Sequence, residues 1–91
     1  MITTTVWSWD GIAKGDYIPI QLHFGPENVN RLSTVVASIC ELTGDSPFVG
    51  AATMEVHNIA PADGGQVDFV VAILWSEDLP FRLNIAVHNI V

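Results

Sequence analysis

The segment Gln66–Ser76, QVDFVVAILWS, decides which fold the sequence predicts. In an extended chain its apolar residues fall on both sides, with Phe69 and Ile73 on one and Val70 and Leu74 on the other. A strand that is apolar on both faces is typical of the centre of a sheet that is covered on both sides. We therefore predict a buried central strand here.

Four further segments show the alternation of apolar and polar residues that predicts a strand. These are Ile2–Trp9, Tyr17–Phe24, Phe48–Ile59 and Phe81–Val91. The loop between the first two of them, Asp10–Gly15, is rich in turn residues and predicts a hairpin. In the last strand the residues Phe81, Leu83, Ile85 and Val87 are expected to face inward.

The segment between the second and third predicted strands has the features of a helix. Pro26 and Glu27 suit a first helical turn, and Gly44 suits a C-terminal cap. Apolar and small residues recur between them at spacings of three and four, which predicts one apolar stripe. The stripe comprises Val29, Leu32, Val36, Ile39 and Thr43.

Together these elements predict one α+β domain over residues 1–91, in the order ββαβββ. An antiparallel sheet of about five strands would pack on a single helix, and that helix would cover only one face of the sheet. The composition is 49% hydrophobic and 14% charged, whereas globular chains average about 25% charged residues. We therefore expect a second copy of the chain to cover the other face, in a homo-oligomer and first of all a dimer.

Net charge excludes several classes of partner. Ten acidic residues stand against three basic ones, for a formal net charge of −7, so no basic patch is available for nucleic acid or for an anionic membrane surface. The longest apolar run is far shorter than the ~20 residues that span a bilayer. The first residues lack the features of a signal peptide, and the single cysteine, Cys40, favours a reducing, cytoplasmic setting.

The three histidines are the candidate catalytic residues. His23, His57 and His88 fall at strand positions that we expect to face away from the helix, and Glu55 lies beside His57. Imidazole is the natural acid or base near neutral pH. A shared metal ion is not expected, because neighbouring strands lie ~4.8 Å apart and the histidines would be spread over several of them. No cofactor motif is present.

Four residues are candidates for a binding surface: Trp7, Trp9, Tyr17 and Arg82. The predicted hairpin would gather the three aromatic residues near its end, and such residues are favoured at interfaces because one end is apolar and the other can hydrogen-bond. Arg82 is the one cation of the C-terminal half and is expected to pair across strands with Glu55 or Asp68.

These observations favour a non-enzymatic binding or assembly protein, a homo-oligomer that associates through the face or edge of its sheet and contacts another protein or a small ligand. The first alternative is a small enzyme with a pocket between subunits and a histidine as acid or base. The second is an acidic inhibitor that occupies a basic site on another macromolecule.

Overall fold

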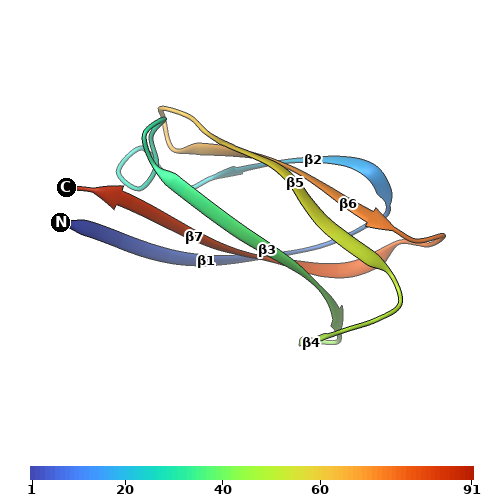
Figure 1. Ribbon diagram of the computed structural model, residues 1–91. Coiled ribbons are helices and arrows are strands. Elements are labelled where there is room, and N and C mark those ends of the chain that lie inside the picture. Colours follow the sequence, from blue (N-terminus) through green and yellow to red (C-terminus); the bar gives the residue numbers. More distant parts are fainter.

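A computed structural model of residues 1–91 shows seven β-strands and no helix. The strands are β1 (Ile2–Ala13), β2 (Gly15–His23), β3 (Thr34–Thr43), β4 (Ser46–Phe48), β5 (Thr53–Pro61), β6 (Gln66–Leu74) and β7 (Leu79–Ile90). They form two antiparallel sheets that face each other, as Figure 1 shows. The first sheet has the order β1-β7-β3-β4 and the second has the order β2-β6-β5. The predicted α+β class is therefore wrong, and the fold is all-β.

The predicted helix is replaced by a loop and by strand β3. Val35 and Ile39 of β3 pack against the core, whereas Val36, between them, is 51% exposed. This period of two is a strand pattern, and the Thr, Val and Ile residues of the segment favour strands because their branched side chains fit a pleated surface. The spacing of three and four was a coincidence within that pattern, and Leu32 of the supposed stripe is 81% exposed.

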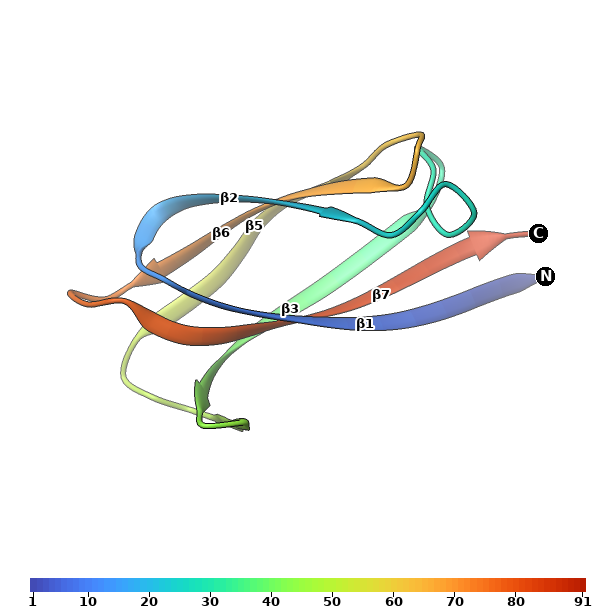
Figure 2. The same cartoon turned by 180° about the vertical axis from the view of Figure 1, so that it is seen from behind.

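The predicted hairpin between the first two strands is also wrong. β1 continues through the expected turn to Ala13, then crosses at Lys14 into the other sheet, where β2 begins. Figure 2 shows this tight bend between β1 and β2. β1 pairs with β7 along its whole length, and β2 pairs with β6. β5 and β6 form a hairpin, and β7 then returns to the first sheet.

The core lies between the two central strands, β6 and β7, which belong to different sheets. Each contributes four side chains that are at most 1% exposed: Val67, Phe69, Val71 and Ile73 from β6, and Phe81, Leu83, Ile85 and Val87 from β7. The inward orientation predicted for the last strand is confirmed. The inner face of β6 is thus covered by a second sheet of the same chain, whereas the sequence predicted a helix in that place.

The two margins of the sandwich differ. At one margin β3 and β5 lie side by side, so the sheets approach each other (Figure 1). At the other margin β1 and β2 are joined only in sequence, and two tryptophans of β1 fill the space beneath them. Trp7 meets Phe24 edge-on with ring centroids 5.1 Å apart, and Trp9 meets Phe81 edge-on at 5.8 Å. Both tryptophans remain more than a third exposed.

Candidate functional site

The outer surface of the first sheet differs in character from the rest of the molecule. Because side chains alternate along a strand, one set of residues from β1, β7 and β3 faces away from the core. We call this set the β1–β7–β3 face. It comprises Ile2, Thr4, Val6, Ser8, Asp10 and Ile12 of β1, Pro80, Arg82, Asn84, Ala86, His88 and Ile90 of β7, and Thr34, Val36, Ser38 and Cys40 of β3.

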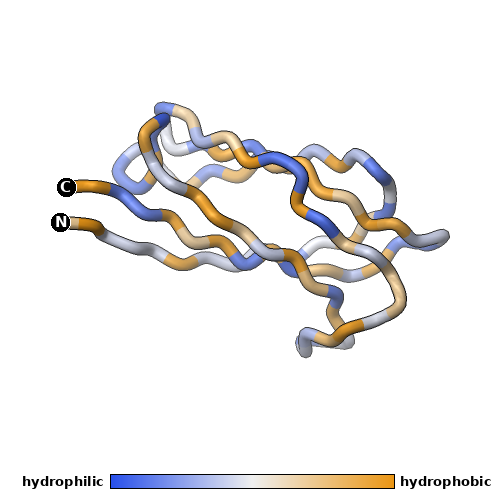
Figure 3. Tube along the Cα trace, viewed as in Figure 1, coloured by the Kyte–Doolittle hydropathy of each residue, from blue (hydrophilic) through white to orange (hydrophobic).

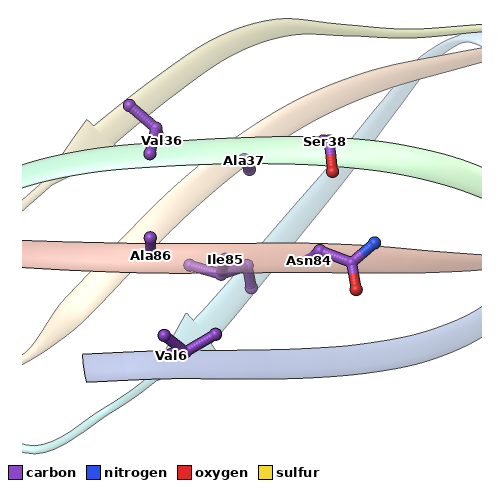
Figure 4. Close-up of a pocket in the computed structure, with 7 residues that line it drawn as sticks. All are labelled: Val6, Val36, Ala37, Ser38, Asn84, Ile85 and Ala86. Carbon is purple, nitrogen blue, oxygen red and sulfur yellow. The ribbon is translucent and has the colours of Figure 1, made fainter. Parts of the chain in front are cut away.

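Strand register arranges these residues in rows of similar chemistry. One row is Val6–Ala86–Val36, the next is Ser8–Asn84–Ser38, and Thr4–His88–Thr34 lies on the other side of the first. Figure 4 shows the first row across the three strands, with Asn84 and Ser38 of the second row beside it. Their side chains are short, and they border a shallow, open hollow lined by Val6, Val36, Ala37, Ser38, Asn84, Ile85 and Ala86. An open surface of short side chains suits contact with another sheet or strand better than enclosure of a small molecule.

The face carries no net charge. Its two charged residues pair with each other: Arg82 Nε lies 2.7 Å from Asp10 Oδ1, and Arg82 Nη2 lies 3.1 Å from Asp10 Oδ2. The hydrogen bond from Arg82 lowers the pKa of Asp10 below its ordinary value, and the same bond raises the pKa of Arg82. The predicted partners of Arg82, Glu55 and Asp68, are wrong, because both belong to the second sheet. The net charge of −7 is therefore carried by residues away from this face.

Replacing Asp10 with asparagine is expected to lower stability slightly at neutral pH and not at all in strong acid. Because the pKa of Asp10 is below 3.8 in the folded state, the pair stabilises fully above that value and its contribution is lost as the pH falls through the lowered pKa. The effect is small because the pair is exposed to solvent. Urea unfolding of wild type and D10N at several pH values measures the difference in their free energies of unfolding. D78N, in the exposed turn before β7, controls for the loss of one negative charge; a difference between wild type and D10N that persists in strong acid would contradict the prediction.

The candidate catalytic residues are not gathered in one place. His23 ends β2, His57 lies in β5, and His88 lies in β7 of the other sheet, where its Nδ1 is 2.8 Å from Thr4 Oγ1. Glu55 and His57 do come together, with Oε2 and Nε2 3.2 Å apart, and both side chains are about half exposed at 47%. No group of three or more His, Cys, Asp or Glu side chains is placed to hold a metal ion.

The aromatic candidates are divided between two surfaces. Trp7 and Trp9 lie on the inner side of β1 at its free edge, whereas Tyr17 lies on the second sheet and is 70% exposed. Tyr17 borders a second hollow together with Pro19, Gln21 and Asp68, in which Gln21 Nε2 donates to Asp68 Oδ1 at 3.0 Å. A third hollow lies where β3, β4 and β5 meet. None of the three hollows is lined by a histidine or by Glu55.

Sequence reasoning missed the residues that make the neutral face. Val6, Ser8, Val36 and Ser38 are common residue types with no chemical signature, and the last two were assigned to a helix. One feature of the sequence could have indicated this face: Asp10 is the one charged residue in the stretch Ile2–Ala13. In Figure 3 the hydrophilic colour is strong along β5 and in the loops, whereas most of β1 is pale or orange.

Comparisons with protein-family models, with curated proteins and with solved structures find no match to this chain. The structure contains no helix long and apolar enough to cross a membrane. A proposal about function therefore depends on the surface of the molecule itself.

Proposed function

We propose that this chain is an assembly module that associates with itself through its first sheet, by the β1–β7–β3 face or by the adjoining edge of β1. The observation that carries the proposal is that this surface has no net charge although the chain as a whole carries −7. Apolar side chains are also exposed on it next to one another: Val6 and Val36 lie on either side of Ala86, and Ile2 lies opposite Ile90. Exposed apolar side chains that cluster, and do not lie singly, are typical of an interface.

Electrostatics favours this surface over any other for contact between copies. Two bodies of the same net charge repel each other, and the repulsion is strongest where unpaired charges approach closely. On the β1–β7–β3 face the one acid, Asp10, is already neutralised by Arg82. The second sheet, by contrast, presents Asp16, Glu55 and Asp68. Two copies can therefore approach through the first sheet at the lowest electrostatic cost.

The other two functions have no comparable support. The pair Glu55–His57, which an enzyme would use, is exposed on a strand and borders none of the three hollows. The acidic residues that an inhibitor of a basic site would use are spread over several loops and both sheets, so they form no single acidic patch. We therefore propose neither.

Native mass spectrometry combined with sedimentation velocity tests the proposal. We expect a dimer or larger oligomer at micromolar concentration, and we expect added salt to leave it intact or to strengthen it, because salt screens the repulsion between the acidic bodies. A protein that stays monomeric up to about 100 μM, a concentration at which even weak specific contacts are populated, would overturn the proposal. Dissociation of an oligomer by moderate salt would equally contradict a contact through the neutral face.

A further inference from the structure

We infer that a second copy of this chain pairs antiparallel with the free edge of β1, so that two first sheets join into one continuous sheet. The inference rests on the proposed self-association and selects its geometry: contact is made by the edge of β1, and the outer face over β7 and β3 stays uncovered. Each first sheet has four strands, so the joined sheet has four from each copy, with the two β1 strands at its centre.

The edge of β1 is long and regular. β1 pairs with β7 without interruption from Ile2, opposite Ile90, to Ala13, opposite Leu79. On its other side it has no partner strand, so alternate backbone N–H and C=O groups along its 12 residues point outward unpaired. Such an edge is a template for another strand.

Proteins protect the edge strands of their sheets from pairing with other chains by proline, lysine, bulges, short length or a covering element. β1 has none of these features. Every other edge of this molecule has one of them. β2 contains Pro19 and a register shift near its start, β5 contains a register shift and lies against β3, and β4 has three residues. β1 contains neither proline nor lysine, and the side chain of its one charged residue, Asp10, is bound to Arg82. The unprotected edge is thus a specific feature of this strand.

The geometry of β1 suits a copy of itself. A twofold axis perpendicular to the joined sheet keeps both outer faces on the same side, so outward residues of one copy lie opposite outward residues of the other. In the register with Trp7 on the axis, Ile2 meets Ile12, Val6 meets Ser8, and Thr4 meets Asp10. Two apolar ends are matched, and the acid lies opposite a hydroxyl group and not opposite another acid.

Neighbouring registers are poorer. Placing Val6 on the axis leaves residues 11–13 without partners, and placing Ser8 on the axis puts Asp10 opposite Val6. The Trp7 register also covers the open margin of the sandwich, because the partly exposed Trp7 meets its own copy and Trp9 meets Thr5. Cross-strand aromatic pairs of this kind stabilise antiparallel sheets.

Paired substitutions on β1 test both the edge and the register. V6E/S8E places two carboxylates directly opposite two others, and we expect the dimer dissociation constant to rise by about 100-fold or more. V6K/S8E places lysine opposite glutamate at the same positions, and we expect it to restore the constant to within about tenfold of wild type. The matched control is V36E/S38E, which changes the same residue types on the same face but on β3, one strand beyond β7. We expect it to leave the dimer intact.

Sedimentation equilibrium, with circular dichroism to confirm folding, distinguishes the outcomes. A V6E/S8E protein that remains dimeric overturns the edge pairing, as does a V36E/S38E protein that dissociates equally, and in both cases the proposed self-association stands. A V6K/S8E protein as dissociated as V6E/S8E overturns the Trp7 register. A monomeric wild type overturns the inference together with the proposed function.

Discussion

Replacing Gly65 with alanine is expected to lower the free energy of unfolding by roughly 3–5 kcal/mol, from backbone strain and steric overlap together. Gly65 has φ +92°, a conformation that side chains rarely adopt, and an added Cβ would lie 2.6 Å from the Cα of Gly25. The two loops cannot easily separate, because Phe24 N donates to Gly65 O at 2.7 Å and Phe24 belongs to the core. The substitution would therefore disturb both the turn after β5 and the end of β2.

Gly64 provides the matched control. Its φ is +95°, nearly that of Gly65, but no atom lies within 4 Å of the place where its Cβ would be. G64A should therefore show the backbone strain alone, about 1–2 kcal/mol. Chemical unfolding of both variants at one fixed protein concentration measures the difference, since self-association makes apparent stability depend on concentration. Equal losses in the two variants would mean that the contact with Gly25 is unimportant.

Replacing Phe81 with alanine is expected to cost about 3–5 kcal/mol, the usual range for removing a buried aromatic side chain. Phe81 is 1% exposed, and its ring supports Trp9 at 5.8 Å. An added Cβ on Gly11 would lie 2.8 Å from the Phe81 ring, so the backbone of β1 already approaches this ring closely. The loss would leave a cavity between the sheets and remove the support of Trp9.

The control for this variant is F48A. Phe48 lies on the short strand β4 and is 39% exposed, so we expect its loss to cost about 1 kcal/mol. Unfolding by denaturant, followed by the fluorescence of the three tryptophans, reports the stability of both variants. If F81A and F48A lost the same stability, the core between β6 and β7 would be less tightly packed than the structure indicates.

Much of the fold could be predicted wherever the local pattern was unambiguous. The strands predicted near 2–9, 17–24, 66–76 and 81–91 exist, and the inward residues of the last one are confirmed. The strand predicted over 48–59 forms only from Thr53 onward, because residues 49–52 connect it to β4. Residues 34–43 were wrongly assigned, because Val36 and Ile39 fit both a helical stripe and a strand, and the choice between them was made by pairing with β7. The turn residues of Asp10–Gly15 were equally ambiguous. They predicted a hairpin, but β1 passes through Gly11 without turning and continues to Ala13.

The candidate site was predictable only in part. The idea that contact between copies involves the sheet came from composition and remains a prediction, whereas the residues of the neutral face could not be named before the strand pairing was known. The ion pair Asp10–Arg82 shows why: its two partners are 72 positions apart in sequence, and they meet because β1 and β7 are neighbours.

Outside residues 34–43, the sequence by itself determined which segments extend, which side of each strand is apolar, and how strongly acidic the chain is, because these properties depend on neighbouring residues alone. Only the tertiary structure decided which strands pair, that two sheets enclose the core, and that the charges of the β1–β7–β3 face cancel. Backbone hydrogen bonds are nearly the same for any two strands, so local sequence carries little information about partners. Partners are chosen by how completely the apolar faces are buried together, and that is a property of the whole chain.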